Sequence, residues 1–135
     1  TMSLFTERGY YVKENNPVYF TNDMKATLHW FHDVLGWYGN VVEKDQDGNG
    51  VYGFVFNIPP EIEITHLAPS NGIHLFVGEP FKGLVAFMSV HGIDALYNYV
   101  TSKNYREITE VKTEPWGAKT CEVRTPDGCV LRFFE

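Results

Sequence analysis

The sequence contains few cysteines and no long hydrophobic run. Only two cysteines occur among its 135 residues, Cys121 and Cys129, and they flank a turn that places them poorly for a disulfide bond. We therefore expect free thiols in a reducing compartment, the cytoplasm. No apolar stretch approaches membrane-spanning length, and the first residues lack the basic-then-apolar pattern of a secretory signal.

The chain is also poor in positive charge. Its 11 lysines and arginines stand against 17 aspartates and glutamates, so the formal net charge is −6 at pH 7. An acidic surface repels phosphate groups, and no basic tract is present to offset it. We therefore expect neither nucleic acid nor a membrane as a partner.

Aromatic residues, by comparison, are abundant. They make up 16% of the chain, and hydrophobic residues as a whole make up 44%. This length and composition suit one compact domain. The aromatic rings can line either its core or a ligand pocket, so their number alone does not choose between the two.

From residue 16 onward the sequence alternates between strand and helix patterns. Residues 17–20 are rich in strand-forming side chains, and Thr21-Asn22-Asp23 then supplies N-cap residues for a helix that is closed by Gly36. Further strands are predicted at 38–43, 51–58 and 73–77, with a hairpin turn at 45–50 and a connecting loop at 59–71.

The second half repeats this order of elements. A strand is predicted at 84–90, a helix at 93–103, and strands at 106–112, 119–124 and 130–135. The repetition predicts an α+β fold of two βαβββ modules, at about 16–79 and 83–135, after an N-terminal arm at 1–15. Such a duplication usually places a ligand site between the two curved sheets.

Motifs at both ends of this pattern resemble those of a known superfamily. The motifs are VYFTNDM at 18–24, WFHDVLGW at 30–37, EPWG at 114–117 and TPDGCVLRFFE at 125–135. Together they resemble the glyoxalase/bleomycin resistance/dioxygenase superfamily, also called vicinal oxygen chelate, over roughly residues 16–135. The resemblance implies a curved, partly open barrel with the helices packed outside, and a homodimer.

Metal-dependent members of this superfamily bind a divalent ion through His, Gln or Glu side chains on four strands. Carried over by position, these ligands fall on Asn16, His74, Val85 and Arg132. Valine cannot bind a metal, and arginine carries a fixed positive charge that repels a cation. The resemblance therefore implies a metal-free, glyoxalase-like member without a cofactor, in which no catalytic residue can be assigned.

Strand alternation predicts which side chains line the space between the modules. The faces that carry the former ligand positions present mostly apolar side chains with a few polar groups, which is typical of a small-molecule site. Trp116, in a loop, either stacks on a ligand or packs as a structural residue. The predicted ligand-binding residues are Arg132, His74, Asn16, Ser89, Phe20, Phe76, Phe87, Phe134 and Trp116.

Arg132 has three possible environments. A buried guanidinium needs a partner, because its desolvation without one costs several kcal/mol. Arg132, helped by His74, could bind an anionic or carbonyl-bearing ligand. Alternatively, it forms an internal ion pair with Glu122 or another acid, or it reaches solvent at the edge of the site.

Three functions follow from these observations. The leading hypothesis is a protein that binds a small anionic or aromatic molecule, for sequestration or sensing, without a catalytic metal. The second is a glyoxalase-like enzyme, a lyase or isomerase, that uses His74 and a remote acid. The third is a regulatory or structural partner without a ligand.

Overall fold

The computed structural model describes residues 4–57 and 71–135. After a short helix α1 (Leu4–Arg8), the first half contains β1 (Val18–Thr21), α2 (Met24–Leu35), β2 (Tyr38–Lys44), β3 (Gly50–Phe56) and β4 (Gly72–Val77). The second half contains β5 (Leu84–Ser89), α3 (Ile93–Ser102), β6 (Lys112–Thr113), β7 (Lys119–Arg124) and β8 (Val130–Phe134). The loop predicted at 59–71 lies, apart from residue 71, outside the described residues.

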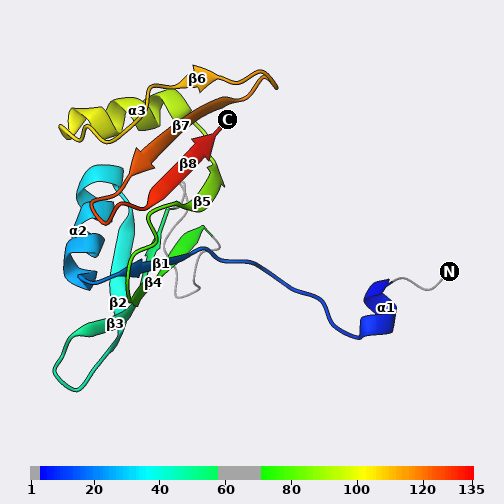
Figure 1. The fold of residues 1–135 in the computed structure, drawn as a ribbon, viewed down its shortest axis with the longest axis vertical. Helices are drawn as coiled ribbons and strands as arrows, with labels where there is room; N and C mark the ends of the chain where they lie inside the picture. The colour runs from blue at the N-terminus through cyan, green and yellow to red at the C-terminus, as the bar shows by residue number, and fades with distance from the viewer. Residues whose placement is uncertain (1–3, 58–70) are drawn as a thin grey trace.

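Each half forms its own four-stranded sheet (Figure 1). The strand orders are β1-β4-β3-β2 and β5-β8-β7-β6, so the last strand of each half lies beside the first. That pair is parallel in both sheets, and the other neighbours are antiparallel. The matching arrangement confirms the predicted α+β fold of two βαβββ modules, which is open rather than closed into a barrel.

Helix α2 begins and ends at the predicted signals. The Asp23 side chain accepts a hydrogen bond from the Ala26 amide at 3.0 Å, which caps the first turn. Gly36 ends the helix in a left-handed conformation with φ 73°, which favours glycine. Met24, Phe31 and Leu35 form a buried apolar side of the helix.

The core lies between helices α2 and α3 and the sheet faces turned toward them. Tyr19 and Leu75 of the first module are almost fully buried there, as are Leu131 and Phe133 of the second. Strand alternation explains why all four lie on this face. Both cysteines are buried and free, as expected.

The predicted strand at 106–112 is wrong over most of its length. Only Lys112 and Thr113 pair as a strand, and Ile108 makes an isolated bridge with Val123. The Thr109 hydroxyl accepts the amide of Glu122 at 2.8 Å, where a regular ladder would use a backbone carbonyl. This side-chain bond replaces part of the ladder, so the segment follows β7 without joining the sheet regularly.

A cluster of hydroxyl groups around one carboxylate joins the two modules. Asp127, in the turn between β7 and β8, accepts hydrogen bonds from the hydroxyls of Tyr19 at 2.7 Å and Thr27 at 3.1 Å. The Thr27 hydroxyl also lies 2.7 Å from that of Thr21. Burial raises the pKa of Tyr19, so its hydroxyl stays protonated and can donate.

Helix α3 is capped by a residue far away in the sequence. Its own N-cap residue is Gly92, with φ 88° and no side chain. The Glu135 carboxylate, just after β8, accepts the amides of Gly92 and Ile93 at 3.0 Å each. These two hydrogen bonds lower the pKa of Glu135. The end of the last strand therefore holds the start of this helix.

The segment before β1 leaves the modules and runs outward (Figure 1). Its helix α1 was not predicted, and Tyr10, Tyr11 and Val12 are exposed along it. The division between an arm at 1–15 and a domain from residue 16 stays a prediction. In the described residues, no helix combines the length and the apolar character needed to span a membrane.

Candidate functional site

The face of the first sheet that is turned away from the helices carries rows of aromatic rings. Strand register places Phe20, Phe76 and Tyr52 side by side on neighbouring strands. The ring centroids of Phe20 and Phe76 lie 6.2 Å apart, and those of Phe76 and Tyr52 lie 4.9 Å apart. Phe20 is 42% exposed and Phe76 37%. This row is therefore an apolar surface rather than part of the core.

His74 lies in the next row, between Val18 and Phe54. Its ring centroid is 4.8 Å from that of Phe54. Its Nδ1 atom is 2.6 Å from the hydroxyl of Tyr52, and the two ring planes differ by only 8°. Aromatic contacts and one short hydrogen bond thus fix the half-buried imidazole.

The corresponding face of the second sheet carries the remaining predicted aromatic residues. The rings of Phe87 and Phe134 stack with centroids 4.5 Å apart. Strand register places Arg132 beside Phe87, and Ser89 beside Phe134. Phe87 is 55% exposed, and Ser89 is exposed at the end of β5.

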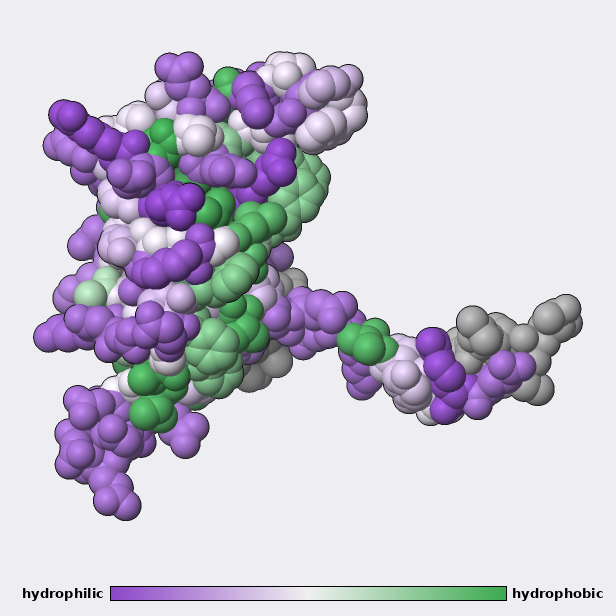
Figure 2. Space-filling view, viewed as in Figure 1, coloured by the Kyte–Doolittle hydropathy of each residue, from purple (hydrophilic) through white to green (hydrophobic). Residues whose placement is uncertain are grey.

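We call these two surfaces together the open face, which comprises Phe20, Tyr52, Phe54, His74, Phe76, Phe87, Ser89, Arg132 and Phe134. Figure 2 shows hydrophobic residues in a band along the side of the molecule from which the arm leaves, spanning both modules. Contiguous apolar surface of this kind marks a ligand or protein interaction site. The predicted residues thus lie in two groups, one on each sheet.

Arg132 has partners within the chain. Its Nη2 atom is 3.4 Å from Oε1 of Glu114, and its Nε atom is 3.8 Å from Oε1 of Glu122. Its guanidinium also lies 5.5 Å from the centre of the Phe87 ring. The internal ion pair is therefore present, although 28% of the side chain stays exposed.

Glu114 is the more buried of the two carboxylates. Its Oε1 atom accepts the Thr120 hydroxyl at 2.7 Å and is 3.4 Å from Nζ of Lys112. The Thr120 hydrogen bond lowers the pKa of Glu114 most, followed by Lys112 and Arg132. A carboxylate held in its charged form neutralises Arg132 without an anionic ligand.

The four positions that correspond to metal ligands do not fit a divalent ion. Val85 packs against the core at an irregularity of β5, and Arg132 is engaged in its ion pairs. Asn16, half-buried just before β1, and His74 leave one amide and one imidazole. In residues 4–57 and 71–135, no group of three or more His, Cys, Asp or Glu side chains could hold a metal.

Trp116 lies in the turn that joins β6 and β7, a hairpin at the edge of the second sheet (Figure 1). Its side chain is 66% exposed. A packed structural position, one of the two alternatives for Trp116, is therefore wrong for the single chain. An exposed tryptophan on a hairpin is available to contact a ligand or another chain.

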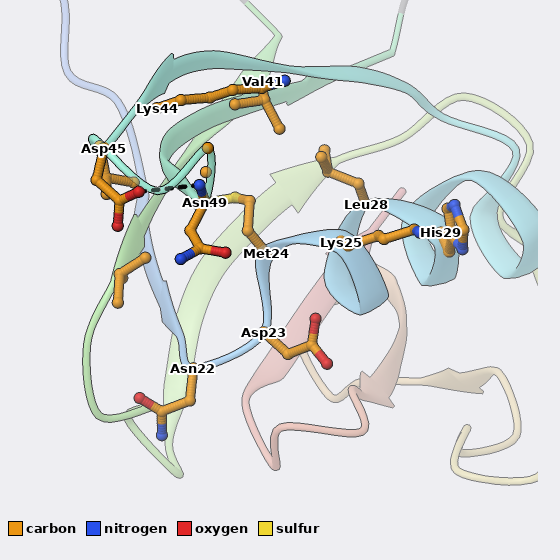
Figure 3. Close-up of a pocket in the computed structure, with 14 residues that line it drawn as sticks. Asn22, Asp23, Met24, Lys25, Leu28, His29, Val41, Lys44, Asp45 and Asn49 are labelled. Atoms are coloured by element: carbon orange, nitrogen blue, oxygen red, sulfur yellow. Dashed lines mark hydrogen bonds between the residues drawn. The ribbon is translucent and has the colours of Figure 1, made fainter.

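A hollow of about 590 Å³ lies on the other side of the first sheet, between the start of α2 and the β2–β3 hairpin (Figure 3). Met24, Leu28 and Val41 form its apolar part, and Lys25 and Lys44 lie at its rim. None of the predicted ligand-binding residues lines it. A smaller hollow of about 100 Å³ lies beside Trp30 and Asp127, also away from the open face.

The sequence prediction missed three residues of the site. Tyr52 and Phe54 alternate with the buried Gly53 and Val55 in β3, a pattern that could have assigned them to the open face. Glu114, the buried partner of Arg132, is 18 residues away from it and gave no comparable signal.

Comparisons with known proteins agree with this architecture. The model of the bleomycin resistance protein domain matches residues 16–78. A bleomycin-binding protein in complex with bleomycin has a TM-score of 0.65 and 14% identity, over 92% of this chain and 98% of that protein. A superfamily member from Sphaerobacter thermophilus has a TM-score of 0.69 and 17% identity, over 93% and 98%. At these identities the likeness shows the fold alone.

A glyoxalase-related enzyme from Clostridium phytofermentans is more similar. It is 52% identical, with a TM-score of 0.85, over 95% of this chain and 98% of that protein. The comparison with curated proteins gave no match. This identity, the match to the bleomycin resistance protein domain and the shared fold together show that the chain belongs to the glyoxalase/bleomycin resistance/dioxygenase superfamily.

Proposed function

We propose that the protein binds a small, flat aromatic molecule on its open face, without a catalytic metal, for sequestration or sensing. The exposed rows of aromatic rings carry this proposal. Phe20, Phe76 and Phe87 are 42%, 37% and 55% exposed, which leaves apolar surface in water that a ligand could cover. Flat rings stack well on such side chains.

The charges favour an aromatic ligand over a strongly anionic one. Glu114 and Glu122 already neutralise Arg132, so the site does not need an anion to compensate a buried charge. The exposed part of Arg132 can still donate a hydrogen bond to a ligand oxygen. His74, Asn16 and Ser89 are the other polar groups that we assign to ligand binding.

We infer that the working form is a homodimer. Ligand sites usually enclose most of the surface of a bound small molecule, whereas the open face of one chain is widely accessible. A second copy could cover it, and Trp116 could then close over the ligand. The formal charge of −6 argues against nucleic acid or an anionic membrane as a partner, and the two free cysteines favour the cytoplasm.

The comparisons support ligand binding and also favour one alternative. A structural neighbour is described as a bleomycin-binding protein complexed with bleomycin, which is consistent with a binding role on this fold. The 52% identical protein is described as a glyoxalase-related enzyme. That description favours a lyase or isomerase as the second candidate, with His74 as its acid–base group.

A thermal-shift screen with flat aromatic compounds tests the binding proposal. A ligand that binds only the folded protein raises its melting temperature through mass action. We expect hits whose shifts fall in Phe76→Ala and in Arg132→Ala. A control substitution on the helix side, Lys25→Ala, should leave the shifts unchanged.

Elemental analysis of the purified protein separates the two candidate functions. The binding proposal predicts no stoichiometric transition metal. Nickel, zinc, iron or manganese at one ion per chain would contradict it and would favour the enzyme. Hits whose shifts survive both open-face substitutions would show that the ligand binds elsewhere.

A further inference from the structure

The contact between Tyr52 and His74 has a chemical direction. The hydroxyl oxygen and Nδ1 are 2.6 Å apart. This separation is that of a short hydrogen bond, in which either atom can be the donor, depending on the tautomer of His74. The two ring planes are 8° apart, and this geometry suits both directions, because the lone pair and an N–H group of Nδ1 both lie in the imidazole plane. A phenol hydroxyl is a stronger acid than the N–H group of a neutral imidazole, and an imidazole nitrogen is a stronger base than a phenol oxygen, so we take Tyr52 as the donor.

A hydrogen bond that Tyr52 donates to Nδ1 determines which nitrogen of His74 carries the proton. In a neutral imidazole one nitrogen is a donor and the other an acceptor. If Nδ1 accepts the Tyr52 hydroxyl, Nε2 must bear the hydrogen. Within residues 4–57 and 71–135, Nε2 has no hydrogen-bond partner. The described residues thus leave the N–H group of this half-buried ring available to a ligand.

We propose that Tyr52 is a positioning residue that fixes His74 as a hydrogen-bond donor toward a ligand, and that the ligand carries a carbonyl or similar acceptor oxygen on its aromatic ring system. This inference rests on the proposed function of the open face. Phe54 and Phe76, with ring centroids 4.8 Å from His74 and 4.9 Å from Tyr52, provide the stacking surface beside the donor. A flat aryl ketone combines the two features that this surface recognises.

Nitrogen-15 NMR of the histidine rings tests the first half of the inference without a ligand. Spectra recorded at about pH 8.5, above the ordinary histidine range, distinguish the protonated from the unprotonated nitrogen. We expect His74 of the wild type to carry its proton on Nε2, and Tyr52→Phe to show an increased population of the other form. A wild-type His74 with its proton on Nδ1 would overturn the inference.

Two probe compounds test the second part of the inference, that the ligand carries an acceptor oxygen. 1-Indanone and indane have the same flat shape, but only the ketone can accept a hydrogen bond. We expect the wild type to bind 1-indanone roughly 2- to 12-fold more tightly than indane, the range of one net hydrogen bond. The preference should fall below about 2-fold in Tyr52→Phe and in His74→Phe, which keeps an aromatic ring.

The matched control is Tyr38→Phe, which removes a hydroxyl from the exposed Tyr38 at the edge of the same sheet. It should keep the wild-type preference for the ketone. Equal affinities of the wild type for the two probes would contradict the donor role of His74, as would an unchanged preference in Tyr52→Phe. Failure of both probes to bind would instead contradict the proposed function, while the NMR measurement would still decide the state of His74.

Discussion

In the first module the open face consists of aromatic rings around His74, whose partner is the neutral hydroxyl of Tyr52. In the second module it combines two stacked phenylalanines with Arg132, which Glu114 and Glu122 neutralise. Strand order and strand direction are nevertheless the same in both modules. The two halves therefore share their topology, whereas the chemistry of their exposed side chains differs.

Helices α2 and α3 also differ, namely in the residue that caps their first turn. Asp23, directly before α2, caps that helix from within its own segment. Helix α3 depends on Glu135, which lies 42 and 43 residues after the two amides that it accepts. The start of α3 therefore depends on the end of the last strand being in place, whereas α2 is capped by a residue directly before it.

The largest effect on stability should come from replacing the buried leucine of β4 or that of β8. Leu75 in β4 and Leu131 in β8 are both completely buried. Replacing either with alanine should lower the free energy of unfolding by about 2–5 kcal/mol, through lost burial and a cavity. Because the modules share one core and the Asp127 contacts, we expect one cooperative transition in urea for both variants. A two-step transition confined to one variant would show that the modules fold separately.

A smaller effect is expected from the contact that joins the modules. Asp127→Ala removes the acceptor of the Tyr19 and Thr27 hydroxyls and should cost about 1–3 kcal/mol in urea unfolding. The control is Asp33→Ala, whose exposed carboxylate pairs, within the described part of the chain, only with the neighbouring His32. It should change the free energy of unfolding by less than about 0.5 kcal/mol. Equal effects of the two substitutions would contradict a joining role for Asp127.

The smallest effect on stability should come from the Glu135 carboxylate that caps α3, and this effect should depend on pH. The amides of Gly92 and Ile93 lower the pKa of Glu135 in the folded protein. Its carboxylate therefore stabilises the fold above the unfolded-state pKa of about 4.3, and this contribution is lost as the pH falls through the lower folded-state value. Glu135→Gln should lower the urea midpoint at pH 7, and the difference from wild type should shrink at about pH 3. A difference that stays constant with pH would argue against a charged cap.

Much of the fold could be predicted because its signals are local. Asp23 and Gly36 bound helix α2, and Pro126-Asp127-Gly128 marks the last turn. Strand alternation also placed Phe20, His74 and Phe87 on one side of the sheets. The prediction of a strand at 106–112 was wrong because a threonine hydroxyl competes there with the backbone hydrogen bonds of the sheet.

The partners within the site could not be predicted, because they depend on how distant strands align. Tyr52 and His74 are 22 residues apart, and Glu114 and Arg132 are 18 apart. Alternation tells which face a side chain occupies, but not which neighbour it meets. The sequence therefore left the ion pair of Arg132 as one of three alternatives, which only the strand register could resolve.

The most direct test is to map where a flat aromatic molecule binds. We predict that 1-indanone, followed by NMR of the isotope-labelled protein, perturbs the side-chain signals of Phe20, Phe76, Phe87 and Phe134 on the open face. The same titration should leave Lys25, Leu28 and Lys44 unperturbed, although they line the hollow of about 590 Å³ behind the sheet. Perturbations confined to that hollow, with the four phenylalanines unchanged, would contradict ligand binding on the open face.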